Sequence, residues 1–138
     1  ITDNRLHLCH VFTVDDLKYL HRGGRVSKTA AIAGSILGIK PLLHVDNEGH
    51  LIPVGKIRGR KQSIEKLVDM MSERMGNWDN STVAVCHGDC LSDAEYAADL
   101  MRKKLGKKTT VHICYTGAVI GSHSGPGTLA LFFMGDQR

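Results

Sequence analysis

Long apolar runs are absent from the sequence. A helix that crosses a membrane needs about 20 mainly apolar residues in succession, but the longest candidate here is the run LALFFM at 129–134. The first residues, which begin with Ile1, also lack the charged segment and the small-residue cleavage site of a secretion signal. We therefore expect no stable membrane insertion, and we expect the chain to be a segment cut from a longer protein.

Cysteines are few, and their placement argues against a disulfide scaffold. Three of the four, Cys9, Cys86 and Cys114, lie in apolar, strand-like segments, where a cysteine is usually a small buried hydrophobic residue. Cys90 stands alone in a predicted turn. This usage is typical of proteins in the reducing cytoplasm, which is the location we expect.

Aromatic residues make up only 5% of the sequence, and the net charge of +4 is modest. Proteins that bind nucleic acids usually combine a denser basic stripe with interleaved aromatic side chains, so we expect no nucleic acid partner. The sequence also lacks a nucleophile with an adjacent base, and it lacks a pair of carboxylates in an apolar setting. No catalytic residue is therefore predicted from these patterns.

What the sequence does contain fits one domain over residues 1–138. With 42% hydrophobic and 23% charged residues, its composition is that of an ordinary soluble domain. Apolar residues at helical spacing predict helices at 13–24, 27–38, 63–76 and 92–106, the last beginning with a Ser92 and Glu95 capping box. Apolar runs predict strands at 5–12, 81–89, 109–117 and 128–135.

The order of these segments predicts the fold class. Residues 39–57 contain two aliphatic runs separated by Asp46 to Gly49, which is typical of a β-hairpin. The last run, 128–135, shows no alternation of polar and apolar residues, so we expect a strand covered on both faces. Together the segments predict an α/β domain in which helices pack on a mixed β-sheet.

The stretch VIGSHSGPG at 119–127 places one histidine in a glycine-rich segment that we expect to be a loop. Its spacing matches neither a P-loop nor a dinucleotide fingerprint. Glycines let main-chain N–H groups approach a ligand, and His123 with the hydroxyls of Ser122 and Ser124 would suit a small anion such as a carboxylate. The alternative is a tight connection whose histidine only caps local backbone groups, and the residues alone leave both open.

Two further segments carry candidate chemistry. The sequence CHGDC at 86–90 clusters potential zinc ligands, but a second ligand pair at suitable spacing is missing, so we predict no metal site. The sequence KIRGRKQS at 56–63 sets Arg58 and Arg60 between a predicted strand and a predicted helix, which suits an anion. The alternative for this segment is a solvated basic face.

Four motifs resemble, in order, those of the DegV family of bacterial fatty-acid-binding proteins. They are LHRGGRV at 20–26, GSILGIKPL at 34–42, KIRGR at 56–60 and GAVIGSHSGPG at 117–127. The similarity extends over nearly the whole chain. One such motif is weak evidence, whereas four in register identify the chain as similar to this family.

The resemblance implies a fold and a function. Members of the family have two α/β domains that hold one fatty acid, with its acyl chain in an apolar tunnel and its carboxylate between the domains. This chain resembles the C-terminal lipid-binding domain, without the N-terminal domain that supplies hydroxyl groups to the carboxylate. The resemblance also implies a carrier that presents a long-chain, palmitate-like fatty acid to a separate ATP-dependent fatty-acid kinase subunit, and it implies no cofactor.

The resemblance also assigns roles to residues. His123 would hydrogen-bond the fatty-acid carboxylate, with Ser122 and Gly121 beside it. Arg58 and Arg60 would lie near the tunnel mouth, close to the head group or to the docked kinase. Apolar side chains would line the acyl tunnel, although plain core packing is an equal alternative for them; they are Ile36, Leu37, Leu42 and Leu43.

Two hypotheses for the function remain, one for a binding protein and one for an enzyme. The first is a carrier protein that binds a fatty acid and has no catalytic activity of its own. The second is an enzyme for acyl or phosphoryl transfer, in which His123 acts as general base and Arg60 holds the anion.

Overall fold

The computed structural model of the chain describes residues 2–27, 38–136 and 138. The strands are β1 (Leu8–Thr13), β2 (Ile39–Val45), β3 (Leu51–Arg58), β4 (Thr82–His87), β5 (Thr110–Tyr115) and β6 (Leu129–Met134). The helices are a 3-10 turn η1 (Thr2–Asn4), α1 (Lys18–Arg22), α3 (Arg60–Arg74), α4 (Leu91–Leu105) and α5 (Ala118–Ser124). Residues 28–37 of the helix predicted at 27–38 lie outside the described residues, and so do Ile36 and Leu37.

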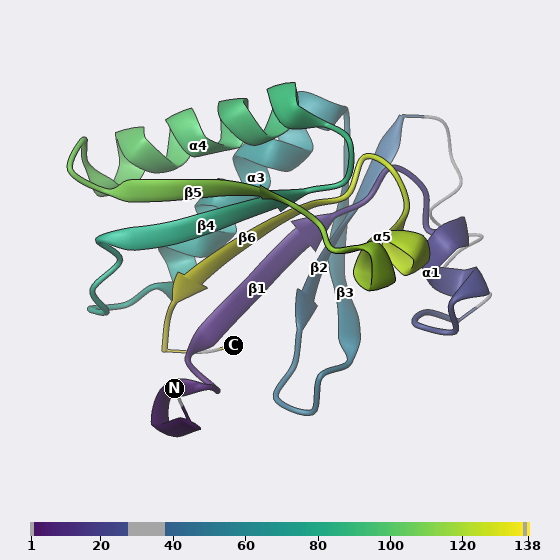
Figure 1. Cartoon of the computed structure of the whole chain (residues 1–138), viewed down its shortest axis with the longest axis horizontal. Coiled ribbons are helices and arrows are strands. Elements are labelled where there is room, and N and C mark those ends of the chain that lie inside the picture. Colours follow the sequence, from purple (N-terminus) through teal and green to yellow (C-terminus); the bar gives the residue numbers. More distant parts are fainter. Residues whose placement is uncertain (1, 28–37, 137) are drawn as a thin grey trace.

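Within the described residues, six strands form one mixed sheet in the order β3-β2-β1-β6-β4-β5 (Figure 1). Strands β4 and β5 are parallel, and helix α4 makes the crossover that a parallel pair requires. The other neighbouring strands are antiparallel, including the predicted hairpin of β2 and β3. The mixed α/β sheet predicted from the sequence is confirmed, and its last strand, β6, lies in the middle between β1 and β4.

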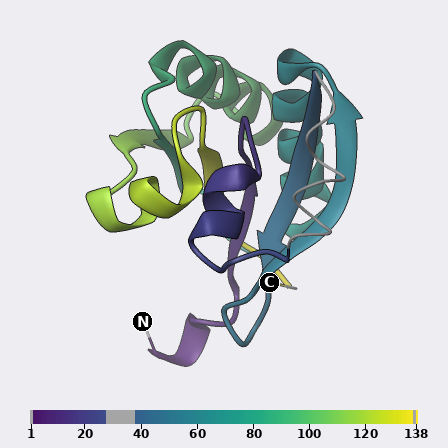
Figure 2. The ribbon, with the colours of Figure 1, turned by 90° about the vertical axis from the view of Figure 1, so that its right-hand side faces the viewer.

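Helices α3 and α4 pack against each other and cover one face of the sheet (Figure 2). Helix α3 buries Ile64, Leu67 and Met71, the apolar stripe that its sequence predicts. Alternate residues of the central strands complete this core from the sheet side, among them Val11, Val85, Leu131 and Phe133. Burying each such side chain contributes about 2 kcal/mol, so this layer supplies most of the hydrophobic stabilisation.

Helices α1 and α5 lie side by side at the end of the sheet where β1 ends (Figure 1). A second cluster, made of Phe12, Val14, Leu17, Leu20 and Leu43, joins α1 to the sheet. Because side chains alternate along a strand, Phe12 points to the face opposite Val11 and therefore away from α3. This opposite face of the sheet carries the pocket described below.

The glycine-rich stretch differs from its prediction as a loop. Residues Ala118–Ser124 form helix α5, and Gly125 ends it with a φ of 81°, a left-handed conformation that suits glycine. The main-chain N–H groups of Gly121 and Gly125 donate to the carbonyl oxygens of Gly117 and Gly121. These N–H groups form hydrogen bonds inside the helix. The expectation that they face a ligand is therefore wrong.

Three smaller predictions are also wrong. Helix α4 begins at Leu91, one residue before Ser92, and no side chain caps its first turn, so the Ser92 and Glu95 capping box is not formed. Strand β6 is not equally covered on both faces, because alternate residues along it are fully and half buried. The thiol of Cys114 lies at an exposed position and that of Cys86 is half-buried, whereas Cys9 is buried as predicted.

Candidate functional site

An apolar pocket of about 410 Å³ lies on the face of the sheet opposite α3 and α4. Pockets for small molecules typically measure about 300–1,000 Å³ and are lined mainly by hydrophobic side chains. The central strands contribute Phe12, Cys86, Ala130 and Phe132, and the helices contribute Leu20, Ile120 and His123. The pocket therefore suits a ligand with a substantial apolar portion.

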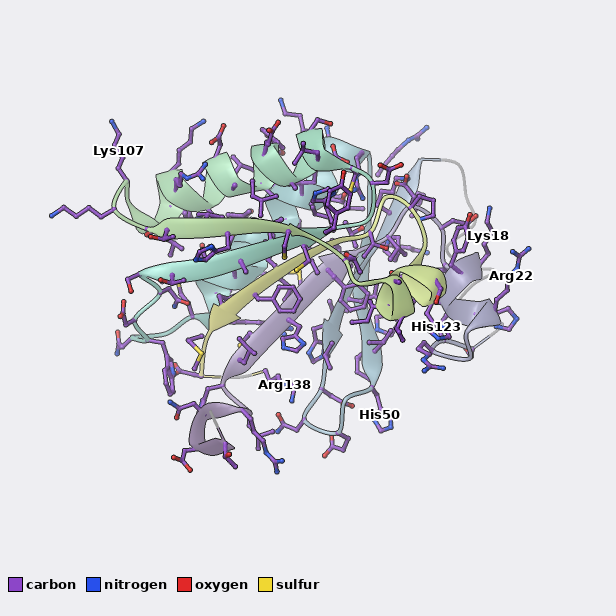
Figure 3. The ribbon with its side chains drawn as sticks, in the orientation of Figure 1. Lys18, Arg22, His50, Lys107, His123 and Arg138 are labelled. Atoms are coloured by element: carbon purple, nitrogen blue, oxygen red, sulfur yellow. The ribbon has the colours of Figure 1, made fainter. Side chains whose placement is uncertain are left out.

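His123 brings an imidazole to the pocket from the last turn of α5. Figure 3 shows this side chain where α5 lies beside α1. Gly23, the residue that ends α1, lies directly against the ring, and a β-carbon there would collide with Nδ1 of His123. The glycine at this position therefore allows α1 and α5 to approach with the imidazole between them.

The other residues predicted beside His123 are placed differently. Ser122 is exposed, and its hydroxyl donates to the carbonyl oxygen of Val119 at 2.8 Å. Neither Ser122 nor Gly121 lines the pocket. Ser124 does line it, but its hydroxyl donates to the carbonyl oxygen of Ile120 at 2.9 Å. Because a hydroxyl has one proton to donate, these serines have no further donor for an anion.

Two polar atoms in the pocket region have no hydrogen-bond partner among the described residues. They are Nε2 of His10 and Oγ1 of Thr116, and both residues line the pocket. Burial, assisted by the positive charge of Arg138, lowers the pKa of His10 to about 4, so its ring is neutral near pH 7. Neither residue stands out in the sequence, although strand alternation places His10 on the same face as Phe12.

The basic turn lies outside the pocket lining. Arg60 is 20% exposed, and its Nε donates to Oδ2 of Asp93 at 2.8 Å. Its Nη1 lies 3.7 Å from Oδ1 of Asp15, so the guanidinium belongs to a network between α3, α4 and the segment after β1. Arg58 is exposed at the end of β3. The structure therefore does not bring Arg58 or Arg60 together with His123.

The leucines predicted for the acyl tunnel lie on opposite faces of β2. Leu42 belongs to the core under α3 and α4, whereas Leu43 belongs to the cluster of Phe12 and Leu20. Neither leucine is part of the pocket lining. Phe12 and Leu20, which belong to the same cluster as Leu43, do line the pocket. Leu43 therefore supports the pocket wall from behind, and Leu42 packs in the helix-side core.

The β2–β3 turn carries a cluster of polar side chains apart from the pocket. Among the described residues, Asp46, Glu48 and His50 at the β2–β3 turn bring possible metal ligands within 4.8 Å of one another. Oδ1 of Asp46 already accepts the main-chain N–H groups of Glu48 and His50, which is the hydrogen bonding of a turn. No helix in the described ranges is long and apolar enough to span a membrane.

Comparison with known proteins identifies relatives along the whole chain. Residues 1–136 match the model of the DegV family, which is described as a family of uncharacterised proteins. A DegV domain-containing protein of Clostridium perfringens is 46% identical over 138 residues, which is all of this chain and 47% of the relative. The chain spans about half the length of the curated relatives it matches.

Solved structures share the fold. A fatty-acid-binding DegV family protein from Streptococcus agalactiae is 29% identical with a TM-score of 0.84, over 99% of this chain and 47% of that chain. The fatty acid kinase (Fak) B3 protein of Streptococcus pneumoniae, loaded with linoleic acid, has a TM-score of 0.86 over 98% of this chain and 47% of that chain. Its identity is 17%, so this second likeness concerns the fold alone.

Proposed function

The chain belongs to the DegV family, and we propose that residues 1–138 form the C-terminal domain of a protein that binds a long-chain fatty acid. The acyl chain lies on the open face of the sheet, in the pocket lined by Phe12, Ala130 and Phe132. The observation that carries this proposal is the apolar character of that pocket, together with the imidazole of His123 in its lining. The fatty-acid-binding relative from Streptococcus agalactiae supports the ligand class.

The energetics of the acyl chain fit this pocket. Each methylene group removed from water contributes about 0.8 kcal/mol, so a long acyl chain binds mainly through the apolar surface that it buries. An aromatic and aliphatic lining offers that surface, and it offers no ionised carboxylate that would repel the ligand head group. A neutral His10 also adds no charge to the floor of the pocket.

The carboxylate requires hydrogen-bond donors, because an ion that leaves water without them loses several kcal/mol. We assign this role to the imidazole of His123, which lines the pocket and contacts Gly23 at the end of α1. Val119 and Ile120 lie on the same helix, and their side chains are 76% and 65% exposed. Adjacent exposed apolar side chains of this size often mark a surface that another part of the protein covers. The remainder of the full-length protein covers these side chains and adds further donors to those of the pocket, which include the unpartnered hydroxyl of Thr116.

We further propose that the bound carboxylate is presented to a separate ATP-dependent fatty-acid kinase. The shared fold with the Fak B3 protein is compatible with this role. Arg58 is free to contact such a partner, because its side chain is exposed at the end of β3. Arg60 has a different role in this proposal, since Asp93 and Asp15 hold its guanidinium within the domain.

The alternative function, an enzyme for acyl or phosphoryl transfer, requires a base and an anion clamp at one site. His123 and Arg60 were the residues assigned to these roles, and Arg60 does not line the pocket that holds His123. This separation favours the carrier over the enzyme. The enzyme would turn over an acyl or phosphoryl substrate when purified without a partner, whereas the carrier would not.

The experiment that tests the function is native mass spectrometry of the full-length protein, before and after removal of bound lipid. We expect one fatty acid per protein chain, which is identified after extraction and rebinds when palmitate is added. A delipidated protein that takes up no palmitate or longer fatty acid would contradict the proposal. Turnover of substrate without an added kinase would instead support the enzyme.

A further inference from the structure

Two cysteine thiols face each other across neighbouring strands, and one of them, Cys86, lines the pocket. Cys86 on β4 and Cys114 on β5 are partners in the register of the parallel pair, and their sulfur atoms are 2.7 Å apart. Figure 1 shows β4 and β5 side by side along their length. The two residues are 28 positions apart in the sequence, so only the pairing of the strands brings them together.

The backbone geometry at this pair suits a cross-link. Neighbouring strands lie about 4.8 Å apart, and the α-carbons of disulfide-bonded cysteines are usually about 4.4–6.8 Å apart. Paired residues of parallel strands direct their side chains to the same face of the sheet. A bond between the two sulfurs therefore requires no movement of β4 relative to β5.

We propose that Cys86 and Cys114 form an oxidative modification site, a dithiol that hydroperoxides convert to a disulfide and that thiol reductants restore. Cys114 is exposed and meets the oxidant first, while Cys86 is half-buried and lines the pocket. The assignment of these roles depends on exposure and on the contact between the sulfurs. It is independent of the ligand that the pocket holds.

The reaction proceeds in two balanced steps. The Cys114 thiolate attacks a hydroperoxide, so that an S–O bond forms, the O–O bond breaks, and the leaving oxyanion takes up a proton to become water or an alcohol. The Cys86 sulfur then attacks the resulting sulfenic acid. The S–S bond forms, the S–O bond breaks, and the hydroxide departs as water with the proton of the Cys86 thiol. Two thiols lose two electrons in total, and one hydroperoxide is reduced.

The environment of Cys86 fits the second step. Burial, together with the hydrogen bond to Cys114, raises the pKa of Cys86 to about 12, so this thiol remains protonated until its neighbour has reacted. The remaining cysteines are placed differently. Cys9 is buried on the helix side of β1, and the thiol of Cys90 donates to the carbonyl oxygen of Thr128 at 3.3 Å.

The test treats the full-length, delipidated protein with hydrogen peroxide, blocks free thiols with iodoacetamide, and maps cross-linked peptides without reduction. Trypsin leaves Cys86 and Cys90 together in peptide 75–102, with Cys114 in peptide 109–138. A second digest with a protease that cleaves before Asp89 separates Cys86 from Cys90. We expect a peptide pair that links Cys86 to Cys114 and disappears with dithiothreitol.

Three variants make the result specific. The cross-link should be lost in Cys86→Ser and in Cys114→Ser, and it should persist in Cys90→Ser, which is the matched control. Serine differs from cysteine by one atom, and circular dichroism verifies that each variant is folded. The proposal is overturned if peroxide oxidises Cys114 to the sulfinic acid without a cross-link, or if the cross-link joins Cys114 to Cys90.

Discussion

Gly23 and His123 are in direct contact. The space between the α-carbon of Gly23 and Nδ1 of the imidazole admits a hydrogen atom but no β-carbon. The contact joins the end of α1 to the last turn of α5. Gly23 has a φ of −76°, which any residue adopts, so its small size and not its backbone freedom is what this position requires. The position of the imidazole in the pocket therefore depends on a residue 100 positions earlier in the chain.

We predict that Gly23→Ala displaces the imidazole of His123. The added methyl group overpacks the contact between α1 and α5 and should lower the free energy of unfolding by about 1–3 kcal/mol. Fatty-acid affinity should fall towards that of a variant without the imidazole. Urea unfolding measures the first effect, and fluorescence titration with a fatty acid measures the second.

Gly55→Ala is the matched control for this change. Gly55 lies on strand β3, and a β-carbon there would meet only Cδ1 of Leu42 at an ordinary 3.7 Å. The control should leave affinity unchanged. If Gly23→Ala binds the fatty acid as tightly as the unmodified protein, the contact with His123 has no influence on the site.

His123→Ala should weaken fatty-acid binding through the head group. A hydrogen bond to a charged group contributes about 1.5–3 kcal/mol, so its loss should raise the dissociation constant about 10- to 150-fold. Isothermal titration calorimetry on delipidated protein measures the change. His50→Ala is the control, since His50 is exposed on the β2–β3 turn (Figure 3). Its ring pairs there with Asp46. Equal affinities for the two variants would exclude a head-group role for His123.

The long elements of this fold could be predicted from the sequence because their patterns are local. The stripe of α3 repeats at helical spacing, and the turn between β2 and β3 carries its own glycine. Helix α5 could not be predicted in this way, because glycines stand at both of its ends and its internal glycine, Gly121, disfavours a helix by about 1 kcal/mol. Contacts with α1, such as that of His123 with Gly23, favour the helix, and no local pattern encodes them.

The site was predictable only in part, for a similar reason. His123 was singled out from the sequence because a histidine among glycines is unusual in itself, and the structure places its side chain in the pocket lining. Arg60 looked like an anion ligand in sequence, and its ion pair with Asp93 depends on how α3 packs beside α4. The contact of Cys86 with Cys114 depends on the order and register of the strands, which the sequence patterns did not specify.

His10 should make the stability of the domain depend on pH. Its pKa in the folded state, about 4, is lower than the ordinary 6.5 of the unfolded chain, so the unfolded state binds the proton more strongly. The fold has its full stability above pH 6.5 and loses stability as the pH falls from 6.5 towards 4. Between pH 7 and pH 5 the contribution of this group to the free energy of unfolding should fall by about 1 kcal/mol, which is less than the full pKa shift would give because solvent screens part of the ring.

His10→Gln tests this dependence, because glutamine keeps a polar side chain of comparable size and does not titrate. Urea unfolding at pH 7 and at pH 5 should show that the loss of stability on acidification is smaller in the variant by about 1 kcal/mol. The same loss in both proteins would mean that His10 is protonated in the fold as easily as in the unfolded chain.

Arg60 should contribute to stability more than to ligand binding. Removing its guanidinium in Arg60→Ala leaves the half-buried carboxylate of Asp93 without its partner, which should cost about 1–2 kcal/mol. A double-mutant cycle with Asp93→Asn isolates the pair from other effects. Arg58→Ala is the matched control for stability, since Arg58 is exposed and should change it little. A cycle with no coupling energy would mean that the ion pair contributes nothing to folding.

A fatty acid in the pocket should protect Cys86 from alkylation, because this thiol is part of the lining. This prediction depends on the proposed function and uses Cys114→Ser, in which no disulfide with Cys86 can form. At a palmitate concentration about 100 times the dissociation constant, about 1% of the protein remains empty. Labelling of Cys86 by N-ethylmaleimide should then be up to about 100-fold slower.

Cys90 lies outside the lining and serves as the internal control within each sample. Native mass spectrometry verifies that the labelled protein holds a fatty acid. If the labelling rate of Cys86 is unchanged in such protein, the acyl chain lies elsewhere. The cross-link between Cys86 and Cys114 is decided by its own experiment in either case.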